Sequence, residues 1–274
     1  MSDLLHLMER GGLGVVGRRL CGGQPVTVAY LGGSITQAGA APSEPTEDGV
    51  LGTSYRNRTT AWLRQTFPGV AVREIQAGIG GTASDLGAFR LERDVLQYQP
   101  DLLFVEFAVN DGGLPDELIL RTMEGIVRHA RQSDDCLDIC FIYTLSQTHL
   151  PDYEQGQLPR TVRLHEQVAE HYGIPSINVA LPVARQLAEG TLRWDEFSGD
   201  SCHPTEMGHG LYGATIAEAL ARLFAADPAR PSLPRPLTAC PLERGQMIPV
   251  SPADVAAGWA YRPLENRGGW QCFD

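Results

Sequence analysis

Short apolar runs alternate with segments of helical periodicity along most of this chain, and the alternation limits the folds open to it. Five runs are short and bounded by glycine, proline or polar residues, as buried strands are: Val26–Leu31, Val70–Ala77, Leu102–Val109, Leu137–Thr144 and Ser176–Val179. Helices are expected at Ser54–Phe67, Ala83–Gln97, Asp116–Arg131, Gln157–Tyr172, Pro182–Gly190 and Glu206–Phe224. Strands of this kind form parallel sheets covered on both faces. We expect a three-layer α/β/α sandwich around a flavodoxin-like parallel sheet of about five strands, in the order 2-1-3-4-5.

The two ends of the chain differ from this pattern. Residues 1–25 are expected to form a short helix and a glycine-rich approach to the first strand. Eight of the 19 prolines follow Ala226, so no helix continues there. We expect one domain, residues 1–226, followed by a proline-rich arm, residues 227–274. Four aromatic residues predict that the arm docks on the domain or on a neighbouring subunit of a homo-oligomer: Trp259, Tyr261, Trp270 and Phe273.

Charge and cysteine content exclude several classes of protein. The net charge of −11 and the pI near 5.1 argue against a nucleic-acid partner or an anionic membrane surface. No stretch reaches the length of a membrane span, and the first ten residues lack the apolar core of a signal peptide. The six cysteines form no C-x-x-C pair, so neither a zinc knuckle nor a disulfide framework is indicated. We expect a cytoplasmic protein with reduced thiols, no metal and no cofactor.

The first strand ends in the turn Gly32-Gly33-Ser34. Two glycines allow a sharp turn where a Cβ would clash, so Ser34 can stand exposed at the carboxyl edge of the sheet. Open α/β sheets bind their ligands at that edge, which makes Ser34 a candidate nucleophile, although the G-x-S-x-G spacing is absent. An ordinary strand-to-turn connection explains the same tripeptide. The polar loop 37–53 that follows is long enough to form a wall or lid of a site.

Two further turns are expected at the same edge. Gly78-Ile-Gly80-Gly81 follows the second strand and exposes backbone N–H groups before a helix, where negative charge can be held. Asn110 closes the third strand, and its amide can donate a hydrogen bond to an oxyanion. Plain turn chemistry accounts for both stretches equally well.

The pair Asp200 and His203 precedes the last helix of the domain. Three residues apart at a loop-to-helix junction, the carboxylate can hold the imidazole through Nδ1 and leave Nε2 free as a base. The alternatives are a local cap and a solvated histidine, or a metal site with Cys202 and His209 whose spacing fits no common metal site. Three other histidines are expected to be inert on surface helices: His129, His165 and His171.

Taken in order, these stretches resemble the four blocks of the SGNH (GDSL-type) hydrolases. Gly-Gly-Ser34 stands for the Gly-Asp-Ser that names the group, a variant seen in its bacterial esterase branches. Gln76 and Val109 occupy positions where many members have Asn and Gly. The resemblance spans roughly Val26 to Phe224, which makes residues 1–226 the hydrolase domain, and is far more specific than one short motif.

Carried over residue by residue, the resemblance implies a catalytic triad and an oxyanion hole. Ser34 would be the nucleophile, His203 the base and Asp200 the orienting acid. The oxyanion donors would be the backbone N–H groups of Ser34 and Gly81 and the side chain of Asn110, with Gly80 as the alternative to Gly81.

These residues predict a serine ester hydrolase that works through a covalent acyl-enzyme. We expect a small-molecule or carbohydrate ester as the substrate, and we favour an acetyl ester of a carbohydrate. The bacterial branches of the family that this sequence resembles often deacetylate sugars. The loops after Ser34, Gly81 and Asn110 are short and largely polar, so they offer little surface to a long acyl chain. A lysophospholipase or thioesterase acting on longer chains is the rival enzyme. A catalytically idle carbohydrate-binding protein is the rival from another class.

Overall fold

A six-stranded sheet forms the centre of the molecule. The computed structural model describes residues 4–38, 52–227 and 233–248. The strands are β1 (Leu7–Met8), β2 (Val26–Gly32), β3 (Val72–Gly78), β4 (Leu102–Glu106), β5 (Asp138–Tyr143) and β6 (Ser176–Asn178). They lie in the order β1-β6-β5-β4-β2-β3, and all neighbours are parallel except β1 and β6.

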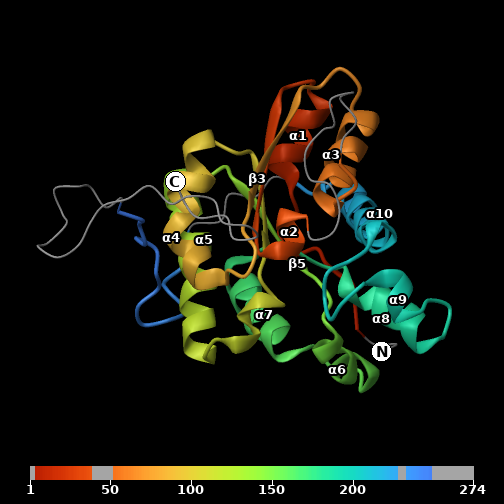
Figure 1. Ribbon diagram of the computed structural model, residues 1–274. Helices are drawn as coiled ribbons and strands as arrows, with labels where there is room; N and C mark the ends of the chain where they lie inside the picture. Colours follow the sequence, from red (N-terminus) through yellow and green to blue (C-terminus); the bar gives the residue numbers. More distant parts are fainter. Residues whose placement is uncertain (1–3, 39–51, 228–232, 249–274) are drawn as a thin grey trace, which may run out of the picture.

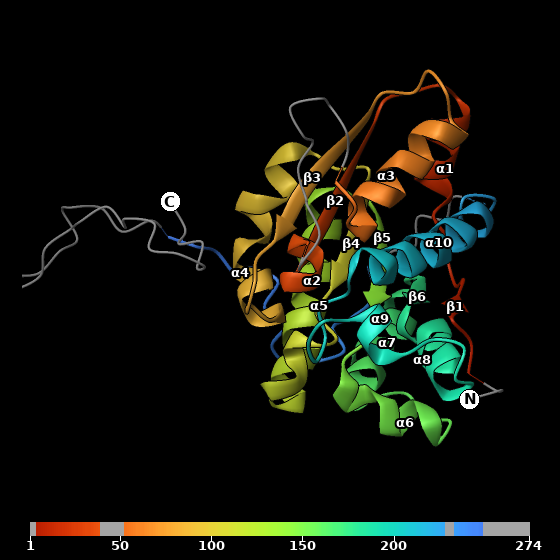
Figure 2. The same ribbon diagram turned by 45° about the vertical axis from the view of Figure 1, so that its right-hand side comes forward.

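The five parallel strands confirm the expected class and relative order, since β3-β2-β4-β5-β6 is the order 2-1-3-4-5. The sixth strand was not predicted. It pairs Leu7 with Ile177 and Met8 with Ser176 at the edge of the sheet, beside the N-terminus (Figure 2). Two residues are too few to show an alternating pattern, so the sequence of this segment carries no strand signal.

Ten α-helices and three short 3-10 turns connect the strands in the described ranges. The longer helices are α1 (Gly14–Cys21), α3 (Tyr55–Thr66), α4 (Ser84–Asp94), α5 (Asp116–Ser133), α7 (Arg160–Tyr172), α8 (Ala180–Ala188) and α10 (Glu206–Leu223). The short ones are α2 (Ser34–Gln37), α6 (Leu150–Glu154) and α9 (Trp194–Phe197), with 3-10 turns at η1 (Leu96–Tyr98), η2 (Asn110–Gly113) and η3 (Gln147–His149). The long helices match the expected periodic segments, whereas no helix was predicted for the three short ones.

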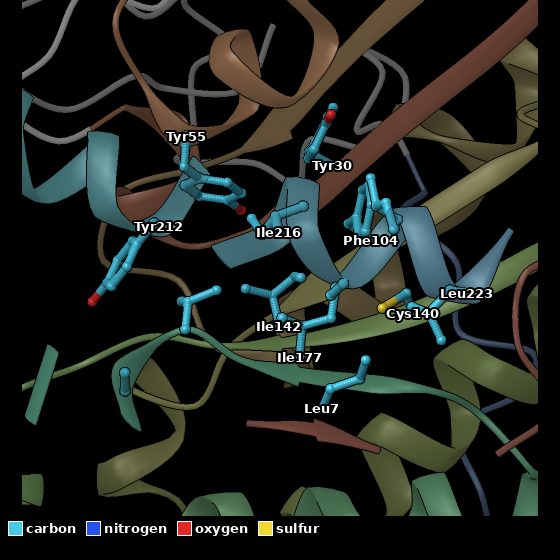
Figure 3. Packing of buried hydrophobic residues seen from close by; sticks show 14 of the residues in the cluster. Leu7, Tyr30, Tyr55, Phe104, Cys140, Ile142, Ile177, Tyr212, Ile216 and Leu223 are labelled. Carbon is cyan, nitrogen blue, oxygen red and sulfur yellow. The ribbon is translucent and has the colours of Figure 1, made fainter. Parts of the chain in front are cut away.

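The helices form two layers because the strand side chains alternate between the faces of the sheet. In β2, Ala29 and Leu31 join the core beneath α4, α5 and α7. Val26, Val28 and Tyr30 join the opposite core, which α1, α3, α8 and α10 cover (Figure 1). Figure 3 shows this second core, where residues from β1, β4, β5 and β6 meet Tyr212 and Ile216 of α10.

Helix α10 carries the C-terminal end of the domain back across the sheet. Thr205 caps it by accepting a hydrogen bond from the Gly208 N–H at 3.2 Å. The tight contacts of Gly208 with Phe197 and of Gly213 with Arg58 let the helix lie close to its neighbours, since a Cβ at either glycine would come within 3.0 Å of another atom. The loop that precedes α10 contains Asp200 and His203 and is thereby held at the carboxyl edge of the sheet.

The described part of the C-terminal arm, residues 233–248, packs on the α5 side. The Leu242 N–H donates to the Arg121 carbonyl at 3.1 Å, and Arg128 donates to the Pro234 carbonyl at 2.8 Å. The four aromatic residues expected to dock the arm lie outside the described residues, as does the segment 39–51 of the expected wall or lid. None of the described helices combines the length and the apolarity needed to cross a membrane.

Candidate active site

Ser34 begins the short helix α2 directly after the end of β2. The two preceding glycines have no room for a side chain. A Cβ on Gly32 would lie 2.2 Å from the Thr36 Oγ1, and a Cβ on Gly33 would lie 2.2 Å from the Asn110 Oδ1. The φ angle of Gly33 is −90°, so lack of space rather than a left-handed backbone requires glycine there. The sharp turn expected from the sequence is therefore present.

The structure brings Ser34, His203 and Asp200 together as one hydrogen-bonded series. The His203 Nε2 lies 2.7 Å from the Ser34 Oγ. The His203 Nδ1 lies 2.6 Å from the Asp200 Oδ2. The other carboxylate oxygen, Oδ1, accepts the backbone N–H groups of Cys202 and His203, at 2.8 and 2.7 Å. The carboxylate thus fixes both the loop and the imidazole.

The environment shifts both ionisable groups of this pair. Partial burial favours a higher pKa for the Asp200 carboxyl, but the hydrogen bonds from Cys202 and His203 outweigh it and lower the pKa to about 2. The Cys202 thiol, 3.8 Å from Nδ1, and the Asp200 carboxylate raise the pKa of His203 to about 9, against the lowering effect of burial. On distance, the 2.6 Å bond to the carboxylate is the stronger of the two contacts.

Three hydrogen-bond donors flank Ser34. Within the described residues, neither the Ser34 N–H nor the Gly81 N–H donates a hydrogen bond. The amide of Asn110 lies against Gly33, with Oδ1 buried and without a partner. No described group accepts a hydrogen bond from its Nδ2. Unsatisfied donors beside a serine hydroxyl are what an oxyanion hole supplies.

The alternative donor, Gly80, is already engaged. Its N–H donates to the Gln37 Oε1 at 2.7 Å. Gln37 lies one turn after Ser34 on α2, so its side chain joins the helix that begins at Ser34 to the glycine turn after β3. Gly81 itself has a φ of +73°, a left-handed conformation that glycine adopts without strain. Gln37 is a residue that sequence reasoning missed, because the expected loop 37–53 hid the helix that carries it.

A buried carboxylate lies beneath the turn that contains Ser34. Glu106, at the end of β4, accepts hydrogen bonds from the hydroxyls of Thr36, at 2.8 Å, and Thr144, at 2.7 Å. The Tyr55 hydroxyl lies 2.8 Å from the same Thr36 oxygen, so α3 is included in the network. Burial raises the pKa of Glu106. The network fixes α2 at its base, and sequence reasoning did not find it either.

Two other histidines that the sequence analysis considered, His165 and His209, lie in the interior. The metal grouping of Cys202, His203 and His209 is not assembled. The His209 Nδ1 accepts the Tyr55 N–H at 3.2 Å and its Nε2 donates to the Ala38 carbonyl at 3.0 Å, while burial lowers the pKa of the ring to about 4. The expectation that His165 lies on the surface is wrong. It is buried and lies 2.8 Å from the Asp111 carboxylate.

The comparisons with known proteins agree on one family. Residues 30–211 match the model of the GDSL-like lipase/acylhydrolase family. An acetylxylan esterase of Geobacillus stearothermophilus is 27% identical over 197 residues, which cover 66% of this chain and 87% of that protein.

The solved structures agree with this match. A two-domain esterase active on acetylated mannans, crystallised with mannopentaose, superposes with a TM-score of 0.72 at 28% identity and covers 85% of this chain. The chain spans 59% of the length of that esterase. An α/β hydrolase from the metagenome of Lake Arreo, at 20% identity and a TM-score of 0.60, shares the fold.

Proposed function

This chain belongs to the GDSL-like lipase/acylhydrolase family, and on that basis we propose that it is a serine esterase that removes acetyl groups from carbohydrates. The observation that carries the proposal is the continuous series from the Ser34 hydroxyl through His203 to Asp200, with hydrogen-bond distances of 2.7 and 2.6 Å. A serine hydroxyl is a weak nucleophile until a neighbouring base takes its proton.

In the proposed reaction, His203 Nε2 takes the Ser34 proton as Oγ attacks the acetyl carbonyl carbon. The carbonyl oxygen becomes an oxyanion and accepts hydrogen bonds from the Ser34 N–H, the Gly81 N–H and the Asn110 amide. The C–O bond to the sugar then breaks, and the imidazolium gives its proton to the leaving alcohol. The acetyl group stays on Ser34.

The second half repeats these steps with water. His203 takes a proton from the water as it attacks the acetyl-enzyme, and the tetrahedral intermediate collapses to release acetate and return the proton to Ser34. Asp200 keeps the imidazole in the tautomer with hydrogen on Nδ1 and stabilises its charged form. One oxygen of the carboxylate serves the ring and the other serves the backbone, so ring and loop are oriented together.

The substrate class rests on the relatives and on the loops around Ser34. Two of the relatives are esterases whose names give acetylated xylan and acetylated mannans as substrates. A long acyl chain needs a continuous apolar surface, because each buried methylene contributes only about 0.8 kcal/mol. The stretches after Gly81 and Asn110, Thr82–Asp85 and Asp111–Leu114, are short and mostly polar.

A substrate panel tests the proposal directly. We expect kcat/KM for p-nitrophenyl esters to be highest for acetyl and to fall beyond butyryl, and acetylated xylo- or manno-oligosaccharides to release acetate. Ser34→Ala is the blank for hydrolysis without the nucleophile. Faster turnover of octanoyl esters would replace the deacetylase with a lysophospholipase or thioesterase. Failure of a fluorophosphonate to label Ser34 would favour the idle carbohydrate-binding protein.

We further propose a cytoplasmic location. No disulfide joins any two of the five cysteines in the described part of the chain, as is usual where thiols stay reduced. The net charge of −11 disfavours nucleic-acid and anionic membrane partners, and we propose none. A homo-oligomer remains a prediction, which light scattering on the purified protein checks.

A further inference from the structure

A buried carboxylate joins the two turns that flank Ser34. Asp111 directly follows Asn110 and is fully buried. Its Oδ1 accepts the backbone N–H of Ser84 at 2.8 Å, and its Oδ2 lies 2.8 Å from the His165 Nε2. Both oxygens are therefore engaged, and each by a different element.

Through its hydrogen bond with the Ser84 N–H, Asp111 caps the N-terminus of α4 from outside the helix. Ser84 is the first residue of α4, and the residue before it, Ala83, has no side chain that could cap the free N–H groups. Asp111 supplies the missing acceptor, and its charge suits the positive end of the helix. Gly81 lies only three residues before Ser84. The bond thus ties the turn of Gly81 to the turn of Asn110.

The bond to His165 holds the same carboxylate from the other side. His165 lies on α7, one turn after Thr161, whose hydroxyl donates to the Ala108 carbonyl at 2.7 Å. Both side chains are buried, with 1% and 3% of the residue exposed. Two side chains on one face of α7 therefore hydrogen-bond to the chain before and after Asn110. An imidazole between α7 and the turn leaves Asp111 little freedom to move away from Ser84.

We propose that Asp111 is a positioning residue that sets the Asn110 amide and the Gly81 N–H at the spacing the oxyanion requires. The inference rests on the proposed esterase function. A buried carboxylate is costly to desolvate, and an Asp or Ser at position 83 would cap α4 with no such cost. A carboxylate from the neighbouring strand end does what a local cap cannot, since it fixes two loops relative to each other. A displacement of about 1 Å at such donors can lower the rate about 10²-fold.

The kinetic test compares Asp111→Ala with a matched control. We expect Asp111→Ala to lower kcat for p-nitrophenyl acetate by about 10- to 100-fold, with KM little changed, because the donors act on the transition state and not on the bound ester. Thr122→Val is the control. It removes the hydroxyl that lies 2.6 Å from the Ser84 Oγ, so it disturbs the same residue without touching Asp111. We expect it to lower the melting temperature and leave kcat within twofold.

A double-mutant cycle separates positioning from general damage. If Asp111 acts through the oxyanion donors, Asn110→Ala combined with Asp111→Ala loses less than the product of the two single effects. Asp111→Asn should restore most of kcat, since an amide accepts the Ser84 N–H and can donate to the His165 Nε2 when the ring carries its hydrogen on Nδ1. Multiplicative losses in the double mutant, or an Asp111→Ala enzyme within threefold of wild type, would overturn the inference.

Amide hydrogen exchange tests the tether without turnover. We expect the Ser84 amide to exchange at least tenfold faster in Asp111→Ala than in wild type, and unchanged exchange would reject the tether. If Asp111→Ala does not fold, His165→Phe removes one of the two carboxylate partners and should give a smaller loss of kcat at constant KM. A wild-type protein that hydrolyses no ester rejects the proposed function, whereas the exchange result still decides the tether.

Discussion

At the scale of single residues, Asp200 and His203 differ in how far their side chains are exposed to solvent. The Asp200 side chain is 53% exposed and that of His203 is 32% exposed. A carboxylate so open to water owes its low pKa to the two backbone N–H bonds and the His203 ring, not to its surroundings as a whole. With a pKa of about 2, the Asp200 carboxyl is ionised at neutral pH.

The raised pKa of His203 predicts an activity that increases toward alkaline pH. The imidazole must be neutral to take the Ser34 proton, and its pKa of about 9 keeps the ring protonated to a higher pH than an ordinary histidine. We expect the acid limb of kcat/KM for p-nitrophenyl acetate to have its midpoint above the ordinary value, and Asp200→Asn to lower both kcat and that midpoint. Ser34→Ala supplies the blank for spontaneous hydrolysis. A midpoint that Asp200→Asn does not move would contradict the assigned pair.

Ser34→Ala should abolish turnover while leaving the fold intact. Removal of the nucleophile costs about 10⁴-fold or more in kcat in comparable triads. The substitution removes one oxygen from a helix start where alanine fits, so circular dichroism and the melting temperature should match wild type. Activity within tenfold of wild type would place the nucleophile elsewhere, with Cys202 the next residue to test.

Asn110→Ala should separate an oxyanion donor from a turn residue. If the amide serves the oxyanion, kcat falls by roughly 10²–10³ with KM little changed. Because Oδ1 has no hydrogen-bond partner in the described structure, loss of the side chain removes no internal hydrogen bond and should change the melting temperature little. A lower melting temperature with unchanged kcat would leave only backbone donors in the hole.

At the scale of elements, one buried arginine holds the ends of two strands. Arg90 of α4 is fully buried and donates to the carbonyls of Ala77, at 2.5 Å, and Gly32, at 2.9 Å. It also lies 3.1 Å from Asp94. Gly32 precedes the turn of Ser34, and Ala77 precedes the turn of Gly80 and Gly81. The spacing of the two turns therefore depends on this side chain.

Arg90→Met should lower the free energy of unfolding by about 2–4 kcal/mol, because it leaves two carbonyls and a carboxylate without their buried partner. Arg93→Met is the matched control, since Arg93 lies 2.7 Å from the same Asp94 but is 40% exposed. We expect it to cost about 0.5 kcal/mol or less. Urea unfolding of both variants measures the difference, and equal effects would mean that Arg90 adds nothing beyond its ion pair.

The sequence predicted the strands and helices whose apolar residues recur at a regular spacing. It missed the elements that are too short to show such a spacing. The parallel strands and long helices were found because their apolar residues recur at strand or helix spacing. Strand β4 ends at Glu106, earlier than the predicted Val109, because the backbone turns into η2 while the apolar run continues. Helices α2 and α9 have four residues each, too few for a periodic signal.

The sequence analysis singled out the residues of the candidate site itself but not the buried residues that hold them in place. Ser34, Asn110 and the Asp200–His203 pair could be proposed as site residues because each follows a strand or precedes a helix. The supports Asp111 and His165 lie 54 residues apart, and no local pattern relates them. One signal was present for His165: it lies on the same helical face as Val162 and Val168, which are buried. Periodicity thus marked it as an interior histidine.

At the scale of the whole molecule, residues 233–248 add a strap to the α5 layer. Glu124 of α5 accepts hydrogen bonds from the Leu237 and Thr238 N–H groups, at 2.5 and 2.8 Å, and from the Tyr172 hydroxyl at 2.5 Å. Gly125 lies so close to Leu242 that a Cβ would come 2.6 Å from its carbonyl carbon. The strap is therefore fitted to this helix, although the division into residues 1–226 and 227–274 stays a prediction.

Truncation after Ala226 should lower the melting temperature, since it leaves Glu124 and Arg128 without their partners in the strap and uncovers the face around Gly125. Truncation after Ile248 is the matched control, because it keeps every described contact of the strap. Thermal unfolding and light scattering of the two shortened proteins measure the effect. Equal stability of the full chain and the protein ending at Ala226 would show that the strap adds nothing.

The shared volume of Gly33 and Asn110 also limits how the chain can be redesigned or can diverge. Because the amide occupies the place of a side chain at position 33, the aspartate that names the family cannot be introduced there unless Asn110 first finds another position. The two turns are thus in direct contact, although 77 positions separate Gly33 from Asn110. A variant with a side chain at position 33 therefore requires the Asn110 amide to shift, so the two positions are best varied together.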